Sequence, residues 1–395
     1  MSTRRADVAI VGGGLTGCAA AYYLARRGRS VVVLERGFVG AQSSGVNFGN
    51  LRLQGRYLPQ LPLALRAQAM WEGLEAELGD SVEFVQAGHV HVALNAAQAQ
   101  EIERHAVDCR PYGLEVEILD RRETIRRWPF LGAGVLAASW SPRDAVVNSR
   151  LVCPAFARAA IALGAAIVEE IEVTAIEHAS GRFTLRTDRD LVVEAGCLIN
   201  AAGAWAAPLA RRFGEEAPVF PAGPVQMVTE PVPAFVAPVI HAVDGSILFR
   251  QTARGNVLVA GHPRVTVDAE GRRSRVPPAK MAVNMARLAA VAPHMRAHHI
   301  IRAWTGIEGY LPDMLPALGP SGTTPGLFHA FAFSGHGLQI GPAVGAVLAE
   351  LIVDGGTPTP IAPFSIGRFR EPVAADRDRL RHEFYDDVLD RRPSA

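Results

Sequence analysis

The stretch that decides the fold runs from Asp7 to Arg36 and reads DVAIVGGGLTGCAAAYYLARRGRSVVVLER. An apolar run leads into three consecutive glycines, a segment with helical periodicity follows, and a second apolar run ends at Glu35. This order is typical of a β-α-β unit with G-x-G-x-x-G between its first strand and its helix. The stretch therefore predicts a dinucleotide-binding unit rather than an ordinary glycine-rich turn.

Each glycine of this motif, and the glutamate that follows it, has its own expected role. Gly12 makes the tight turn, Gly14 lets backbone N–H groups approach a pyrophosphate, and Gly17 allows helix and strand to pack closely. The anion would lie at the helix N-terminus, where unpaired N–H groups and the helix dipole favour negative charge. Glu35 closes the second strand, where a carboxylate can accept hydrogen bonds from a ribose.

Composition restricts the class of protein. The chain has 395 residues, 49% of them hydrophobic, and a formal net charge of +1. It is long enough for two domains, and its small net charge provides no general attraction for nucleic acid. The four cysteines are scattered without a C-x-x-C pair, so we expect no disulfides, no zinc site and a cytoplasmic location. Polar residues interrupt the apolar stretch 338–353, so we expect no membrane span.

Segments with helical periodicity alternate with β-rich segments along the chain. Helical periodicity marks residues 61–78, 97–109, 150–163 and 279–291. β-rich segments separate these helices, and a strand, a Gly-His-Gly turn and a helix follow from Leu327. We predict an α/β fold in which a Rossmann-like domain is interleaved with an α+β substrate domain on a largely antiparallel sheet. The expected bounds are 1–80, 146–216 and 320–367 for the first domain, 81–145 and 217–319 for the second, and 368–395 for a helical tail.

Further segments accompany the first motif in a fixed order. They read SSGVNFGNLR, LINAAGAW, RAWTGIEGYLPDMLPALG and FSGHGLQIGPAVG. Together with GGGLTG they resemble the D-amino-acid-oxidase-like flavoprotein family, and within it the glycine oxidase and sarcosine oxidase branch. The resemblance spans nearly the whole chain. It implies FAD as the cofactor and an amino acid or amine as the substrate.

The resemblance also implies which residues contact FAD. It places Gly12, Gly14, Gly17 and Glu35 on the ADP half, Val173 near the adenine, and Ala202 and Gly203 near the pyrophosphate. Around the flavin it places Ser44, Asn47, Gly49 and Asn50. The other residues expected to contact the cofactor are Thr16, Arg36, Ser43, Leu51, Trp205 and Gly306.

The Gly-His-Gly turn has a chemical role that can be stated independently. When an amine gives a hydride to flavin N5, negative charge collects at the N1 and O2 edge of the ring. Backbone N–H groups of the turn and the following helix N-terminus are placed to stabilise that charge. The residues concerned are Gly335, His336, Gly337, Leu338 and Gln339. The alternative is a turn that only caps a packed helix.

The mode of FAD attachment follows from the cysteines. Some family members link the flavin to a cysteine in the segment before this turn, but residues 301–319 contain none. We therefore expect noncovalent FAD.

The substrate end departs from the family pattern. Glu308 stands where the glycine oxidase pattern has an arginine, and Gln339 stands where sarcosine-type members have a lysine. Both familiar carboxylate anchors are thus missing, which argues against glycine or sarcosine as the substrate. Arg52 and Arg250 are the candidate replacements, because a guanidinium can bind a carboxylate through two hydrogen bonds. A structural ion pair is the alternative for each arginine.

Other candidates have equally open alternatives. Glu308 receives the substrate amine or pairs with an arginine, and His336 contacts the substrate or holds the turn. Tyr310 and Met227 are either pocket walls or core residues. His89 shares one strand face with His91, but no third ligand is evident, so we predict no metal site.

Oxygen reactivity is a separate question. Sarcosine-type members use a lysine near the flavin to help O2 react. The only lysine here, Lys280, follows two prolines and is expected in an outer helix. This tilts the prediction towards slow oxygen use or another electron acceptor.

These observations lead to one prediction and two alternatives. We predict FAD-dependent oxidation of the C–N bond of an amino acid, in particular an N-substituted one such as an N-carboxyalkyl amino acid, with O2 or another acceptor taking the electrons. One alternative is a dehydrogenase β-type chain that hands electrons to a partner, so a homo- or hetero-oligomer is left open. The other is a flavin-binding protein without catalysis.

Overall fold

The structure is a computed structural model that describes residues 2–371 and 377–390. Its first sheet contains the predicted β-α-β unit, in which β1 (Ser2–Val11) and β2 (Val31–Leu34) run parallel and α1 (Leu15–Arg26) connects them. β2 is buried along its whole length, as expected for a parallel strand covered on both faces. The strand order continues as β19-β20-β11-β1-β2-β8.

Several other segments complete this first layer. The remaining strands are β8 (Ala166–Val168), β9 (Val173–Ala179), β10 (Arg182–Thr187), β11 (Leu191–Asn200), β19 (Ala317–Pro320) and β20 (Leu327–Phe331). The covering helices are α3 (Leu61–Leu78), α6 (Ser149–Ala162) and α9 (Gly337–Val353), with α7 (Ala207–Arg212) after β11. α9 approaches α1 closely, because a Cβ at Gly345 would lie 2.6 Å from the Cβ of Ala19.

The second sheet has the order β17-β13-β16-β15-β14-β4-β6-β5. All its neighbours pair antiparallel except β14 and β4, which run parallel. Its strands are β4 (His89–Ala93), β5 (Glu117–Asp120), β6 (Ala137–Ser141), β13 (Val225–Pro231), β14 (Val239–Ala242), β15 (Leu248–Gln251), β16 (Asn256–Ala260) and β17 (Ile300–Thr305). The accompanying helices are α4 (Ala96–Cys109), α5 (Arg121–Arg127) and α8 (Pro278–Val291). The predicted fold class is thereby confirmed.

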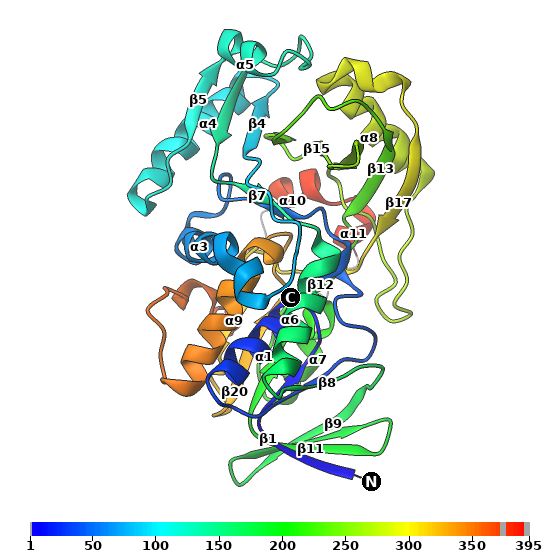
Figure 1. Cartoon of the computed structure of the whole chain (residues 1–395). Helices are drawn as coiled ribbons and strands as arrows, with labels where there is room; N and C mark the ends of the chain where they lie inside the picture. Colours follow the sequence, from blue (N-terminus) through cyan, green and yellow to red (C-terminus); the bar gives the residue numbers. More distant parts are fainter. Residues whose placement is uncertain (1, 372–376, 391–395) are drawn as a thin grey trace.

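Short elements join the two sheets. They are α2 (Ser43–Val46) and the strand pairs β3 (Asn50–Leu51) with β7 (Ala145–Val146) and β12 (Phe220–Ala222) with β18 (Glu308–Tyr310). The C-terminal helices α10 (Arg377–Glu383) and α11 (Asp386–Asp390) follow; Figure 1 shows α10, in red, between the blue-to-orange lower part and the cyan-to-yellow upper part. The domain bounds themselves stay a prediction. Within the described ranges, no helix combines the length and apolarity needed to cross a membrane.

Candidate active site

The glycine turn after β1 forms a cradle for an anion. Gly12 has a φ of +110°, and a Cβ there would collide with the carbonyl oxygen of Ala201. A Cβ at Gly17 would collide with the carbonyl oxygen of Gly12, so both positions require glycine. α1 begins after Gly14 without a side-chain cap from that residue; the N–H of Leu15 donates to Ser44 Oγ at 3.0 Å, and the donors that follow it in the first turn are left for a ligand.

The residues around the cradle fit an adenine dinucleotide. Glu35 lies at the end of β2, where its carboxylate accepts hydrogen bonds from the N–H groups of Gly13 at 2.6 Å and Gly37 at 2.7 Å. The guanidinium carbon of Arg36 lies 4.2 Å from the ring centroid of Trp205, and Arg36 Nη2 is buried without a partner in the described chain. A bound phosphate or ribose oxygen would satisfy this orphaned donor.

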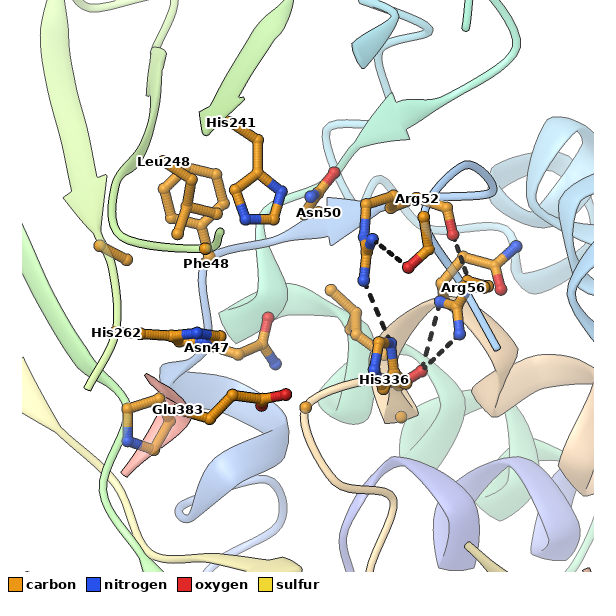
Figure 2. Close-up of a pocket in the computed structure, with 18 of the residues that line it drawn as sticks. Asn47, Phe48, Asn50, Arg52, Arg56, His241, Leu248, His262, His336 and Glu383 are labelled. Carbon is orange, nitrogen blue, oxygen red and sulfur yellow. Dashed lines mark hydrogen bonds between the residues drawn. The ribbon is translucent and has the colours of Figure 1, made fainter. Parts of the chain in front are cut away.

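A cavity of about 870 Å³ extends from this region to the second sheet. Many residues predicted to contact FAD line it, namely Thr16, Ser43, Ser44, Asn47, Asn50, Gly203, Gly335, His336, Gly337, Leu338 and Gln339. The other predicted FAD contacts lie outside this cavity, namely Gly12, Gly14, Gly17, Glu35, Arg36, Gly49, Leu51, Val173, Ala202, Trp205 and Gly306. Figure 2 shows Arg52, Arg56 and His336 on one side of the cavity and Phe48, Leu248 and His262 on the other.

Arg52 is a cation beside the Gly-His-Gly turn. Its Nη1 donates to the carbonyl oxygens of Gln54 at 3.0 Å and Gly55 at 2.7 Å, and its Nη2 lies 3.3 Å from His336 Nδ1. No carboxylate of the described residues forms an ion pair with it. Burial lowers the pKa of the Arg52 guanidinium, because removal from water penalises the charged form.

Arg56 adds a second buried cation behind the same turn. It is 4% exposed, its Nη1 donates to Gln60 Oε1 at 3.1 Å, and both terminal nitrogens lie 3.4 Å from the carbonyl oxygen of His336. Burial, followed by the charge of Arg52, lowers its pKa to about 9. Buried Asp144 interacts electrostatically with both guanidiniums, but burial raises its pKa to about 7, so the two cations outweigh it and make this side of the cavity attractive to an anion.

Two substrate candidates lie outside the cavity lining, where the structure favours the structural alternative for each. Arg250 donates to the carbonyl oxygens of Phe48 and Val147, both at 3.2 Å. It therefore connects the loop between α2 and β3 to the residue after β7, and it does not line the cavity. Met227 is fully buried in the apolar core of the second sheet. Its position on an inward-facing side of β13 makes it a core residue.

Glu308 lines the cavity as expected, but both of its oxygens are already engaged. Oε1 accepts a hydrogen bond from the N–H of Gly335 at 2.8 Å, and Oε2 accepts one from the hydroxyl of Tyr310 at 2.7 Å. Glu308 therefore fixes the turn to β18. The N–H of His336 donates to Phe333 at 3.0 Å, so the free donors of this region are those at the start of α9, which has no side-chain cap.

The C-terminal segment supplies residues that sequence reasoning missed. His382 and Glu383 line the cavity, and Glu383 forms an ion pair of 2.6 Å with Arg264. Phe384 packs on Tyr310 with ring centroids 4.9 Å apart. The spacing of Leu380, Phe384 and Val388 marks one helical face and could have indicated a docked segment.

Lys280 also differs from its expectation. It is fully buried, and its Nζ donates to the carbonyl oxygen of His262 at 2.7 Å. Burial lowers its pKa to about 7. The helix α8 has an exposed face, as an outer helix does, but Lys280 is on its buried face, where a buried carbonyl oxygen needs a donor.

A third histidine joins the pair on β4. His241 stands opposite His91 in the parallel register of β14 and β4, and the ligand atoms of His89, His91 and His241 lie within 4.8 Å of one another. The sequence could not reveal this neighbour, because it depends on the pairing of two strands that are distant in the chain.

Comparison with known proteins agrees with this architecture. The model of the family "FAD dependent oxidoreductase" (DAO) matches residues 7–351. Glycine oxidase of Geobacillus kaustophilus (strain HTA426) is 32% identical over 376 residues, which cover 93% of this chain and 98% of that protein. Sarcosine oxidase subunit beta of Arthrobacter sp is 26% identical, covering 92% of this chain and 91% of that protein.

A solved structure gives the same result for the fold. The crystal structure of glycine oxidase from Geobacillus kaustophilus has a TM-score of 0.86 and 29% identity, covering 92% of this chain and 98% of that one. The sequence resemblance is thus confirmed. The chain belongs to the FAD dependent oxidoreductase family, and it is an FAD-dependent enzyme of the kind that acts on amino-acid C–N bonds.

Proposed function

We propose that the substrate is an N-substituted amino acid, such as an N-carboxyalkyl amino acid, whose carboxylate binds Arg52. The observation that carries this proposal is the placement of Arg52 in the cavity wall beside His336 without an ion pair in the described chain. Buried cations are rarely left without a counter-charge. A substrate carboxylate would supply one.

The shape of the cavity supports a substituent larger than that of glycine. Beyond Arg52 the cavity continues to His241 and Val243 on the second sheet, and it is also lined by Glu383 of the C-terminal segment. A carboxylate held at Arg52 leaves this farther space for the group attached to nitrogen. A glycine molecule would leave it filled with water.

The side chains have distinct roles in this proposal. FAD, when bound, would supply the acceptor for a hydride from the carbon next to the amine. Arg52 orients the carboxylate, and His336 holds the Arg52 guanidinium on the cavity side. Glu308 fixes the Gly-His-Gly turn, while Arg56 and the N-terminus of α9 provide positive potential near it. The imine product would then hydrolyse to a carbonyl compound and an amine.

The test is anaerobic mixing of the FAD-loaded protein with glycine, sarcosine, iminodiacetate and other N-substituted glycines. We expect the flavin absorbance to bleach with N-substituted members, and Arg52→Gln to weaken that bleaching. Arg158→Gln is the matched control, because Arg158 forms only a surface ion pair with Asp80. Equal reduction by the Arg52→Gln and Arg158→Gln variants would contradict the role of Arg52.

A second candidate concerns the electron acceptor. Similarity to proteins named sarcosine dehydrogenase favours an acceptor other than O2, and similarity to a protein named a β subunit favours a chain that works within a hetero-oligomer. Readmitting air to the reduced protein separates the two. Prompt reoxidation with hydrogen peroxide as product supports the oxidase, and persistence of the reduced flavin supports the dehydrogenase. Flavin that dithionite reduces but no amine reduces would instead indicate the non-catalytic alternative.

A further inference from the structure

Three histidines form a cluster on one face of the second sheet. The ring centroids of His89 and His91 are 4.7 Å apart, and those of His91 and His241 are 4.9 Å apart. His91 and His241 line the cavity, whereas His89 lies behind them and is fully buried. Two of the three rings therefore belong to the cavity wall on the second sheet.

The hydrogen bonds of His89 argue against a metal ion there. Gln54 Nε2 lies 2.6 Å from the carbonyl oxygen of His89 and 3.0 Å from His89 Nδ1, so the amide nitrogen donates to both. The carbonyl oxygen of His89 can only accept, which fixes the amide in this orientation, and Ser139 Oγ then donates to Gln54 Oε1 at 2.8 Å. Nδ1 must then accept, which places the proton of the neutral ring on Nε2. A protonated Nε2 has no lone pair for a metal.

The positive charge near the cluster also argues against a metal ion there. A Cβ on Gly55 would collide with both the His91 ring and Arg52 Nη1, so this guanidinium lies close to the cluster. Burial and neighbouring positive groups, Arg52 among them, hold the pKa of His91 and of His241 well below its ordinary value. The rings are therefore neutral, and a dication would meet a fixed positive charge.

The remaining two rings form a pair with a fixed hydrogen-bonding capacity. His91 Nε2 and His241 Nδ1 lie 3.2 Å apart, so one of them donates to the other. If His91 donates, its Nδ1 is an acceptor and His241 Nε2 is a donor. If His241 donates, the two outer nitrogens exchange these roles. In either tautomer the pair has one outer donor and one outer acceptor left for a ligand.

Other polar atoms at this end also lack partners. Asn50 Oδ1 and Gln226 Oε1 are buried acceptors without a hydrogen bond in the described chain, and both residues line the cavity. Figure 2 shows the His241 ring pointing into the cavity from the strand above it. Buried amide oxygens are normally paired, so a ligand that donates a hydrogen bond would satisfy them. A carboxylate has no proton to donate.

From this balance of donors and acceptors, we propose that the His91–His241 pair is a subsite for a hydroxyl group carried by the substrate. A hydroxyl donates one hydrogen bond and accepts others, which matches the pair in both tautomers. The statement that the hydroxyl belongs to a substrate rests on the proposed function. The hydroxyl subsite itself does not. Among N-substituted amino acids, it favours an N-hydroxyalkyl substituent in place of the N-carboxyalkyl example given above.

The experiment uses two pairs of molecules of equal size that differ only by hydroxyl against methyl. The amines are N-(2-hydroxyethyl)glycine and N-propylglycine, compared by anaerobic flavin reduction. The ethers (2-hydroxyethoxy)acetate and propoxyacetate cannot be oxidised in this way, and calorimetry measures their binding to the FAD-loaded protein. We expect the hydroxyl member of each pair to be favoured about tenfold, because one or two hydrogen bonds to buried groups are gained.

Variants assign this preference to the pair. His241→Phe should abolish the tenfold difference while retaining FAD, and His298→Gln, which alters a histidine paired with Glu230 away from the cavity, should preserve it. Asn50→Leu provides a second variant if His241→Phe does not fold, and it should reduce the difference. Circular dichroism and FAD content identify folded variants.

Several outcomes would overturn the subsite. They are equal binding of the two ethers, an undiminished preference in a folded His241→Phe or Asn50→Leu variant, or tighter binding of an ether that ends in a carboxylate. Visible absorption bands from added Co²⁺ that His91→Phe removes would establish a metal site instead. If no amine reduces the flavin but the ethers are still discriminated, the proposed function fails and the subsite stands.

Discussion

Replacing Arg52 by glutamine should separate substrate binding from folding. In the native protein the guanidinium gives two hydrogen bonds to backbone carbonyl oxygens, at 3.0 and 2.7 Å, and no ion pair to the described residues. Losing these bonds costs about 1 kcal/mol each, and removing a desolvated charge offsets part of that loss. The net change in unfolding free energy should therefore stay within about 2 kcal/mol, a shift of a few degrees in Tm.

The effect on the substrate should be much larger. Removing the cation from a desolvated pair with a carboxylate costs about 2–5 kcal/mol. This corresponds to a loss of about 30- to 4,000-fold in kcat/KM. Anaerobic stopped-flow measurement of flavin bleaching gives the loss in reaction with the substrate, and thermal unfolding of the FAD-loaded variant gives the change in stability. A large fall in Tm with unchanged kcat/KM would refute the reasoning and make Arg52 a structural residue.

Three further predictions address the cofactor and a buried lysine. Gly12→Ala should yield a folded protein without FAD, because a Cβ there collides with Ala201 and φ is +110°; Gly73→Ala, where a Cβ meets nothing within 4 Å, should keep full FAD absorbance. Acid precipitation should release all yellow colour, and colour in the pellet would contradict noncovalent FAD. Burial lowers the pKa of Lys280 from 10.5 to about 7, so the unfolded chain binds more protons in that window and native stability should rise with pH there. In denaturant titrations at pH 7 and 9.5, Lys280→Met should lack this rise. An equal change in unfolding free energy between the two pH values in the native protein and the variant would contradict the role of Lys280.

Local sequence patterns were sufficient for the elements whose ends carry their own signals. The helix predicted over 61–78 has the same bounds in the structure, with Pro62 in its first turn and Gly79 in the left-handed conformation at its end. The glycines of the first motif predicted the tight turn after β1, because few residues tolerate such close backbone contacts. The interleaving of the two sheets followed from the order of strand and helix patterns.

The substrate side depended on contacts between distant segments. His241 meets His91 only through the parallel register of β14 and β4. Lys280 is hydrophilic by composition, yet it lies inside because the carbonyl oxygen of His262 accepts its hydrogen bond. Glu308 lines the cavity, but Tyr310 and Gly335 engage both its oxygens through contacts that its sequence position did not indicate.

The central claim is that this chain takes a hydride from an N-substituted amino acid and gives it to FAD. The most direct test is the flavin absorbance of the purified protein after anaerobic addition of N-(2-hydroxyethyl)glycine, N-propylglycine, iminodiacetate, sarcosine and glycine in separate samples. The account predicts rapid bleaching by N-substituted members with larger substituents and slow or no bleaching by glycine. Bleaching by glycine faster than by any N-substituted member would contradict it, as would a flavin that only dithionite reduces.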